Sequence, residues 1–205
     1  MLVQLAKPGT TVVEIGSNIG VHAIPLAQAV GPTGRLIAFE PQRILYQMPC
    51  ANIALNGLTN VWAHQKGVGR EKSTTRIPRL DYAASDNFGG ISLSDGHDGE
   101  AGDVIPLDAL ALPACDLIKI DVEGMECEAI NGAVHTVTQH RPYLYVENDW
   151  KENSARLIGQ LLDLDYRLYW HFPTLFSADN FYNVDENIFQ GVISTNMFCV
   201  PREHT

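Results

Sequence analysis

The sequence predicts a single α/β domain built on an open, doubly wound sheet that is mostly parallel, with an antiparallel last strand. Short β-rich apolar runs alternate with segments of helical periodicity, which indicates parallel strands joined by crossover helices. Several of these runs end in acidic or glycine-rich stretches, as expected where such a sheet binds a ligand beyond the carboxyl ends of its strands. A chain of 205 residues with 45% hydrophobic content can form one sizeable core. We therefore treat residues 1–205 as one domain.

The first part of the chain is expected to contribute three strands and two helices. Apolar β-rich runs mark the strands, and a 3.6-residue periodicity marks the helices. Gly31-Pro32 ends the first helix, and Pro25 within it predicts either a kink or a later start. The strands are placed at Thr11–Ile15, Arg35–Phe39 and 61–66, and the helices at 20–30 and 44–55.

Residues 71–103 are rich in Gly, Asp, Ser and Asn and show no clear period. We expect an irregular excursion there, or a lid over the active site, because long loops in compact domains are often functional.

The alternation of strands and helices resumes after this excursion. Residues 192–200 are expected to form the last strand and to close the edge of the sheet. The strands of this part are placed at 116–121, 142–146, 166–170 and 192–200, and the helices at 124–139 and 154–164.

The composition is that of a soluble globular protein with an acidic balance. The formal net charge is −10, which disfavours a nucleic-acid partner because phosphates demand a Lys/Arg surface. The four cysteines form no C-x-x-C pair and no zinc spacing, which fits buried thiols in a reducing compartment. No apolar stretch is long enough to span a bilayer, and the start lacks the pattern of a signal peptide. We expect a cytoplasmic protein with no membrane partner, either a minimal core or a chain that lacks an N-terminal extension.

The stretch VVEIGSNIG places an acid and two glycines at the end of the first strand. Gly16 allows a sharp turn, and Gly20 lets the next helix start close to the strand and a ligand. Ser17 and Asn18 complete the turn, where helix N–H groups favour a carboxylate or phosphate. Glu14 is placed to hold a ligand ammonium. A dinucleotide fingerprint requires glycine where Asn18 stands, so a smaller amino-acid tail fits better.

Glu40 ends the second strand, about 20 residues beyond the glycine turn, where an acid can accept hydrogen bonds from both ribose hydroxyls. NAD enzymes and methyltransferases share this feature, so it predicts a ribose without choosing the ligand. The structural alternative is a solvated glutamate before a proline turn.

Four stretches, VVEIGSNIG, LIAFEPQ, LIKIDVEGMECEAINGA and RPYLYVEND, resemble the FkbM family of S-adenosylmethionine-dependent methyltransferases. The strongest match is KIDVEG followed by a helix, with an acid after the next strand. The resemblance covers about residues 10–150 and implies a Rossmann-like class I methyltransferase fold. It also implies S-adenosylmethionine as the cofactor, with Glu14, Gly16, Asn18 and Gly20 around its methionine part and Glu40 at its ribose.

Members of this family mostly methylate hydroxyl oxygens on sugars or natural products, so the resemblance implies O-methylation of a small polar acceptor. Asp121 lies where the family's fourth strand meets the methyl group, beside the cofactor and able to orient the acceptor. Lys119, two residues earlier, is either structural or catalytic. It is expected to reach an acid, Glu123 or Glu147, because an unpaired buried lysine is costly. His171 is a candidate general base, since histidine titrates near neutral pH.

Asp121 and the Glu147-Asn148 pair after the fifth strand form an oxygen-rich set. Some class I O-methyltransferases, such as catechol O-methyltransferases, place an Asp and an Asp-Asn pair there to hold Mg²⁺, which lowers the pKa of the acceptor hydroxyl. Here Glu147 replaces the first Asp of that pair, and resemblance to the FkbM family alone implies no metal. A Mg²⁺ site and a metal-free site therefore both stay open.

The small-molecule acceptor is expected to lie in a polar pocket with aromatic walls. Asparagine suits sugar-like or amide groups because it offers four hydrogen-bonding directions, although asparagines in loops also stabilise turns. The residues assigned to this pocket are Asn87, Gly89, Glu147, Asn148, Trp170 and Asn180.

Three other functions stay open. An N-methyltransferase of similar fold would need no strong base, because an amine is already nucleophilic. An NAD-binding oxidoreductase is disfavoured by Asn18 and by the lack of a clear Tyr-x-x-x-Lys pair. A non-catalytic cofactor-binding domain would not need Glu14, Glu40 and Asp121 together with the glycine turn.

Overall fold

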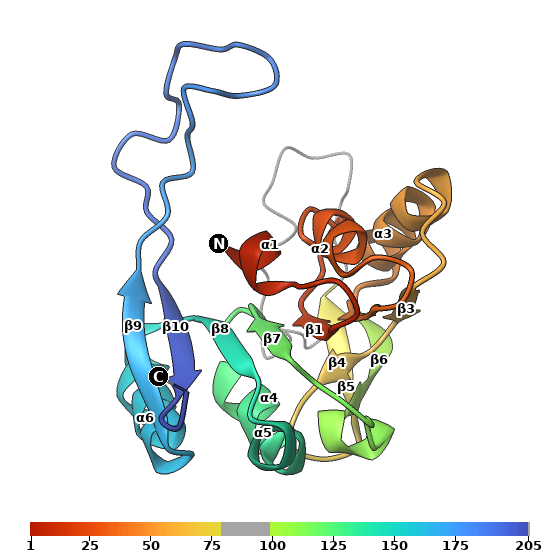
Figure 1. Ribbon diagram of the computed structural model, residues 1–205, viewed down its shortest axis with the longest axis vertical. Helices are drawn as coiled ribbons and strands as arrows, with labels where there is room; N and C mark the ends of the chain where they lie inside the picture. Colours follow the sequence, from red (N-terminus) through yellow and green to blue (C-terminus); the bar gives the residue numbers. More distant parts are fainter. Residues whose placement is uncertain (79–98, 205) are drawn as a thin grey trace.

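The computed structural model describes residues 1–78 and 99–204. The strands of its main sheet are β1 Thr11–Ile15, β2 Arg35–Phe39, β3 Val61–His64, β7 Leu117–Ile120, β8 Tyr143–Glu147, β9 Tyr166–His171 and β10 Asn196–Pro201. Their order in the sheet is β3-β2-β1-β7-β8-β10-β9 (Figure 1). Neighbours from β3 to β8 run parallel, whereas β10 is antiparallel to β8 and β9. The predicted fold class is confirmed, and the strand order reverses between β1 and β7.

Helices cover both faces of this sheet (Figure 1). In the described part of the chain they are α1 Leu2–Leu5, α2 Ala23–Val30, α3 Arg43–Leu55, α4 Glu126–Asn131, α5 Val134–His140 and α6 Lys151–Asp163. Val12 of β1 packs with α1 and α2 in one core cluster, whereas Val13 packs with α4, α5 and α6 in the other. Successive strand residues point to opposite faces, and both of these are fully buried. Strands covered on both faces read as continuous apolar runs, which is why the sequence marks them clearly.

Two predicted helices differ from the structure. Helix α2 begins at Ala23 and not at residue 20, which is the later start that Pro25 predicted as one alternative. Pro25 therefore lies in the first helical turn, where its missing N–H removes no hydrogen bond. The single helix predicted over 124–139 is in fact α4 and α5. The helix breaks at Gly132, where a Cβ atom would lie 1.9 Å from the carbonyl oxygen of Gly69. Close approach of these two backbones therefore requires glycine at the junction of the two helices.

The prediction of irregular structure over 71–103 is wrong at both ends of that segment. Strands β4 Gly67–Val68, β5 Ser73–Pro78 and β6 Gly99–Ile105 form a second sheet in the order β4-β6-β5. Strands β5 and β6 pair antiparallel over their length, from Ser73 opposite Val104 to Pro78 opposite Gly99. This pairing joins segments that are distant in sequence, so local composition alone does not reveal it.

The last strand also differs from its predicted place. Strand β10 spans Asn196–Pro201 and lies between β8 and β9, so β9 and not β10 forms the edge of the sheet. Residues 172–195, which we call the arm, connect β9 to β10 and extend away from the sheet (Figure 1). A single bridge between Thr174 and Ile193 joins the two limbs of the arm near its base. Among the described residues, none of the helices has the length and apolar character that a membrane crossing requires.

Candidate functional site

A pocket of about 790 Å³ lies at the carboxyl ends of β1, β2, β7 and β8. This is the position at which a doubly wound sheet binds its ligand. Several of the residues predicted from the sequence line it, although the motifs that carry them are far apart in the chain. They are Gly16, Ser17, Asn18, Glu40, Lys119, Asp121 and Glu147. Asn87 and Gly89, assigned to the acceptor, lie outside the described residues.

The glycine turn after β1 is shaped by contacts within the protein. Gly16 has φ +85°, and a Cβ atom on it would lie 1.8 Å from the carbonyl oxygen of Asp121. Glycine is therefore needed for the ends of β1 and β7 to approach each other. Gly20, with φ +89°, faces Pro49 of α3, where a Cβ would lie 3.0 Å from the Cβ of the proline. Gly20 is not among the described pocket-lining residues, so its contacts explain helix packing instead of ligand approach.

Glu40 is held rigidly at the end of β2. Its Oε2 atom accepts a hydrogen bond from the backbone N–H of Asn18 at 2.9 Å, and its Oε1 atom accepts one from the N–H of Gln42 at 2.9 Å. The side chain is 5% exposed, and burial raises the pKa of its carboxyl group to about 7 despite these two hydrogen bonds. Each oxygen keeps a further lone pair, so Glu40 can still accept hydrogen bonds from a ligand.

Glu14 does not line the pocket in the described part of the chain. It is fully buried beneath it, and neither carboxylate oxygen has a hydrogen-bond partner among the described residues. Two basic groups lie near its Oε1 atom, Nδ1 of His22 at 3.8 Å and Nζ of Lys119 at 3.9 Å. Burial raises the pKa of Glu14 to about 7, although Lys119 opposes this effect. The ammonium beside Glu14 in this structure is thus that of Lys119.

Lys119 is the buried cation of the site. Its Nζ atom lies 3.0 Å from Oδ2 of Asp121 and donates a hydrogen bond to the carbonyl oxygen of Gly16 at 3.1 Å. The prediction that Lys119 reaches an acid is confirmed, but its partners are Asp121 and Glu14 and not Glu123 or Glu147. The sheet register explains this choice, since Lys119 on β7 lies directly opposite Glu14 on β1. Burial alone would lower the pKa of Lys119, but the two carboxylates outweigh burial and raise it, so the ammonium stays charged.

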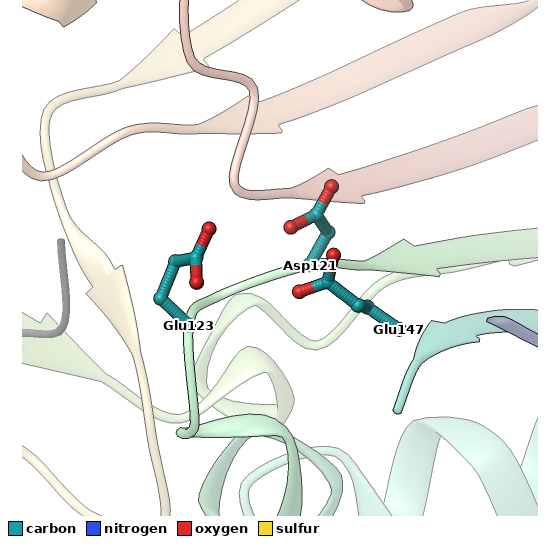
Figure 2. A group of neighbouring side chains, drawn as sticks. All are labelled: Asp121, Glu123 and Glu147. Carbon is teal, nitrogen blue, oxygen red and sulfur yellow. The ribbon is translucent and has the colours of Figure 1, made fainter. Parts of the chain in front are cut away.

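Three carboxyl groups, which we call the acidic cluster, gather in the pocket (Figure 2). Asp121 and Glu123 follow β7 and Glu147 ends β8, and one oxygen from each lies within 4.8 Å of the others. Burial and the charge of Asp121 raise the pKa of Glu123 to about 7 and that of Glu147 to about 9. At neutral pH, Glu147 therefore carries a proton and Glu123 exists in both forms.

Asn148 does not join this cluster. Its side-chain amide donates a hydrogen bond to the sulfur of Met197 at 3.4 Å, within the buried interior. Consecutive strand residues point to opposite faces, so Asn148 turns away where Glu147 faces the pocket. The predicted Mg²⁺ ligand set of Asp121, Glu147 and Asn148 is therefore not assembled among the described residues.

His171 is set back from the pocket. Its Nδ1 atom lies 2.8 Å from the hydroxyl oxygen of Tyr145, and in the described part of the chain it is Tyr145, not His171, that lines the cavity. Trp170 stacks on Phe172 and is 50% exposed. Asn180 hydrogen-bonds within its own turn, to Ser177 and Val184. Neither Trp170 nor Asn180 is among the described lining residues, so their predicted place in the acceptor pocket is not supported.

The pocket also contains residues that the sequence reasoning did not assign to it. Tyr145 lies in the fifth predicted strand, two residues before Glu147, so the two side chains are expected on the same face. This alternation along the strand could have predicted that Tyr145 faces the pocket. The arm contributes a wall of mostly apolar residues, and no sequence period indicates which of them face the cavity. The described lining residues of the arm are Pro173, Leu175, Val192, Ile193 and Ser194.

Comparisons with known proteins agree with this geometry. A model of the methyltransferase FkbM domain matches residues 14–168. Methyltransferase sdnD of Sordaria araneosa is 27% identical over 154 residues, covering 59% of this chain and 59% of the relative. Methyltransferase 1 of Beauveria bassiana (strain ARSEF 2860) is 27% identical over 143 residues, covering 59% of this chain and 57% of the relative. The matches thus span less than two thirds of either relative.

Solved structures show the same fold. The crystal structure of methyltransferase FkbM from Methylobacillus flagellatus KT has a TM-score of 0.65 at 21% identity, covering 94% of this chain and 44% of that chain. The O-methyltransferase TomG from Streptomyces achromogenes, solved in complex with S-adenosylmethionine, has a TM-score of 0.58 at 15% identity, covering 98% of this chain and 76% of that chain. At these low sequence identities, the similarity to the two solved structures shows a shared fold and no more.

Proposed function

Because the chain belongs to the FkbM family of methyltransferases, we propose that it transfers the methyl group of S-adenosylmethionine to a hydroxyl oxygen of a small-molecule acceptor. The observation that carries this proposal is the buried Glu40 carboxylate, fixed by two backbone N–H groups beside the glycine turn at the mouth of β1. An acid in this position accepts hydrogen bonds from ribose hydroxyls. Family membership selects S-adenosylmethionine among the ligands that carry a ribose.

The residues present fit this cofactor. Glu40 offers acceptor lone pairs to hydroxyl donors, and the pocket of about 790 Å³ has room for both a cofactor and an acceptor group. Asn18 lines the pocket where a dinucleotide fingerprint requires glycine, which favours an amino-acid tail over a pyrophosphate. When bound, S-adenosylmethionine supplies an electrophilic methyl group on a sulfonium. The protein must then align the acceptor oxygen and accept its proton.

Glu123 is the group that we assign to accept this proton. It lines the pocket, and its pKa of about 7 lets it be a carboxylate in a substantial fraction of molecules at neutral pH. Asp121 is fixed by the Lys119 ammonium 3.0 Å away, so it can orient the acceptor. His171 reaches the pocket through Tyr145, and we give it the role of positioning that tyrosine.

N-methylation is the second candidate, and the acidic cluster favours it. An amine acceptor arrives as an ammonium, which carboxylates attract, and loses its proton before it attacks. Matched hydroxyl and amine acceptors offered with a methyl-labelled cofactor separate the two functions. If the label is found only on amines, the proposal of O-methylation would be replaced by N-methylation in the same site.

Calorimetric titration with S-adenosylhomocysteine tests the cofactor, with NADH as the control ligand. We expect saturable binding of S-adenosylhomocysteine and none of NADH. Glu40→Ala should weaken the binding about a hundredfold, because two hydrogen bonds to a charged acceptor are lost. Glu40→Gln keeps the shape of the side chain and replaces the alanine variant in this test if that variant unfolds. Glu71→Ala, at an exposed position, is the matched control. Binding of NADH instead, or equal affinity in the Glu40 and Glu71 variants, would overturn the assignment.

A further inference from the structure

The mouth of the pocket carries exposed aliphatic side chains, which we call the aliphatic rim: Val21, Leu175, Val192 and Ile193. All four line the pocket, yet they are 48–65% exposed. Single exposed apolar residues are common on any protein surface. Four that border one cavity give its mouth an apolar character, and exposed apolar surface beside a cavity marks a place where an apolar group can bind.

Three of the four rim residues belong to the arm, and the arm carries the apolar surface further. Phe181 is 90% exposed, Tyr182 is 82% exposed and Ile188 is 73% exposed. The base of the arm therefore borders the pocket, and the arm extends away from the sheet (Figure 1). Large apolar side chains between its two limbs are exposed to solvent.

The charged side chains along the arm are all acidic. Residues 172–195 contain Asp179, Asp185 and Glu186 and no Lys, Arg or His. Behind the rim, Lys66 and Lys119 also line the pocket, but they are outnumbered there by the carboxyl groups of Glu40, Asp149 and the acidic cluster. An anionic ligand approaching along the arm would meet repulsion at both ends, because like charges are disfavoured in a site of low dielectric.

We propose that the aliphatic rim binds the apolar body of the methyl acceptor, an amphipathic molecule without anionic groups whose hydroxyl group reaches the acidic cluster. This inference rests on the proposed function and specifies its substrate class. It disfavours sugar phosphates and nucleotide sugars as acceptors, and it adds an apolar body to the small polar acceptor that the sequence predicts. The acidic arm likewise disfavours an anionic membrane surface as the occupant of the rim, because such surfaces attract basic segments.

Three probes separate the parts of this proposal. Octyl β-glucoside, kept below its critical micelle concentration, has an uncharged hydroxylated head and an apolar body. Glucose has the head alone, and octyl phosphate has the body with an anionic head. Each is titrated calorimetrically into protein saturated with S-adenosylhomocysteine. We expect octyl glucoside to bind at least tenfold more tightly than either of the other two.

The place of binding is tested with the double variant Leu175→Ser/Ile193→Ser. It should weaken octyl glucoside binding at least tenfold. Leu55→Ser is the matched control, because Leu55 is 84% exposed at the end of α3 and does not line the pocket. The control should bind octyl glucoside as the unaltered protein does, and thermal unfolding of all variants verifies that they are folded.

Several results would overturn the proposal. They are equal binding of glucose, equal binding of octyl phosphate, no binding of octyl glucoside, and equal binding by the double variant and the Leu55 control. A dimer in sedimentation that the double variant dissociates would assign the rim to a second copy of the chain. Co-sedimentation with phosphatidylcholine vesicles that the double variant abolishes would assign it to a lipid surface. S-adenosylhomocysteine is titrated first, so failure of the cofactor assignment is seen separately from failure at the rim.

Discussion

The ammonium of Lys119 lies 3.0 Å from the carboxylate of Asp121 at the junction of strand β7 and the pocket. The lysine is almost completely buried, whereas the aspartate side chain is 35% exposed on the pocket side. The buried partner thus fixes the orientation of the exposed one. On its other side Lys119 approaches Glu14, which has no hydrogen-bond partner among the described residues. One cation therefore stabilises two carboxyl groups from neighbouring strands.

Replacing Lys119 by Met should lower the free energy of unfolding by about 3 kcal/mol at pH 8, because it leaves buried negative charge without its partner. The loss should be smaller at pH 5, where Glu14 can take up a proton. Urea denaturation at the two pH values measures both effects. Lys66→Met is the control, since Lys66 and Asp103 form an exposed pair at 3.9 Å and should contribute less than about 1 kcal/mol. Equal losses for the two lysines would contradict a special role for Lys119.

Gly16→Ala should be strongly destabilising, by more than about 3 kcal/mol, because the added methyl group collides with the backbone of β7 and the backbone conformation is also unfavourable. Gly57→Ala measures the part of this free-energy loss that comes from the backbone conformation alone. Gly57 has φ +62° and no atom within 4 Å of an added Cβ, so this variant should lose only about 1 kcal/mol. Denaturation curves of the two variants give the comparison, and similar losses would mean that the strand ends can separate at little cost.

Stability without ligand should fall as the pH rises from about 5 to about 8. The pKa of Glu14 is raised by burial to about 7 in the folded chain, so the folded state binds more protons than the unfolded state between that value and the ordinary pKa of 4.5. The stabilisation is complete below the unfolded pKa and is lost as the pH passes the folded pKa, by about 1.4 kcal/mol per pH unit at most. Glu40 should add a similar loss.

Glu14→Gln should reduce this pH dependence, because the amide does not titrate. We expect the variant to gain about 1–2 kcal/mol relative to the unaltered protein between pH 5 and pH 8. Glu71→Gln removes the same charge at an exposed position and should leave the dependence unchanged. A pH dependence that survives in Glu14→Gln would show that other groups cause it.

Glu123→Gln should lower kcat about a hundredfold or more with little change in KM for the acceptor, because loss of a general base typically costs that much. In the unaltered enzyme, kcat should rise with pH through about 7 as Glu123 loses its proton, and this rise should vanish in the variant. His171→Gln is the comparison. It should keep the pH profile, since His171 acts on Tyr145 from outside the pocket. Loss of the rise in His171→Gln alone would return the role of base to the histidine.

Strands β1 and β2 were predicted to the residue, at Thr11–Ile15 and Arg35–Phe39. Both are buried on two faces, so their apolar runs are continuous and end abruptly at turn residues. The same property brought Glu40 and Asp121 to one pocket, because the carboxyl ends of parallel strands share one edge of the sheet. Local sequence is sufficient to predict an element or a site residue wherever burial and strand direction determine its place.

The errors of the sequence-based prediction arise where contacts between distant segments determine the structure. The partner of Lys119 depends on the register between β1 and β7, which places it opposite Glu14. The pairing of β5 with β6, and the place of β10 inside the sheet, likewise depend on contacts between distant segments. Asn148 is different, because the two-residue alternation along a strand already indicates that it faces away from Glu147.

Strands β9 and β10 are hydrogen-bonded neighbours, so the arm leaves the sheet and returns to it at adjacent points. A connection of this kind can be lengthened, shortened or exchanged at a small entropic cost, roughly 0.6 kcal/mol for each doubling of its length. The strands that position Glu40 and Asp121 would keep their places in such an exchange. The arm can therefore be exchanged while these strands stay in place. If it binds the acceptor as proposed, grafting the corresponding segment from a relative with another acceptor should alter the acceptor specificity.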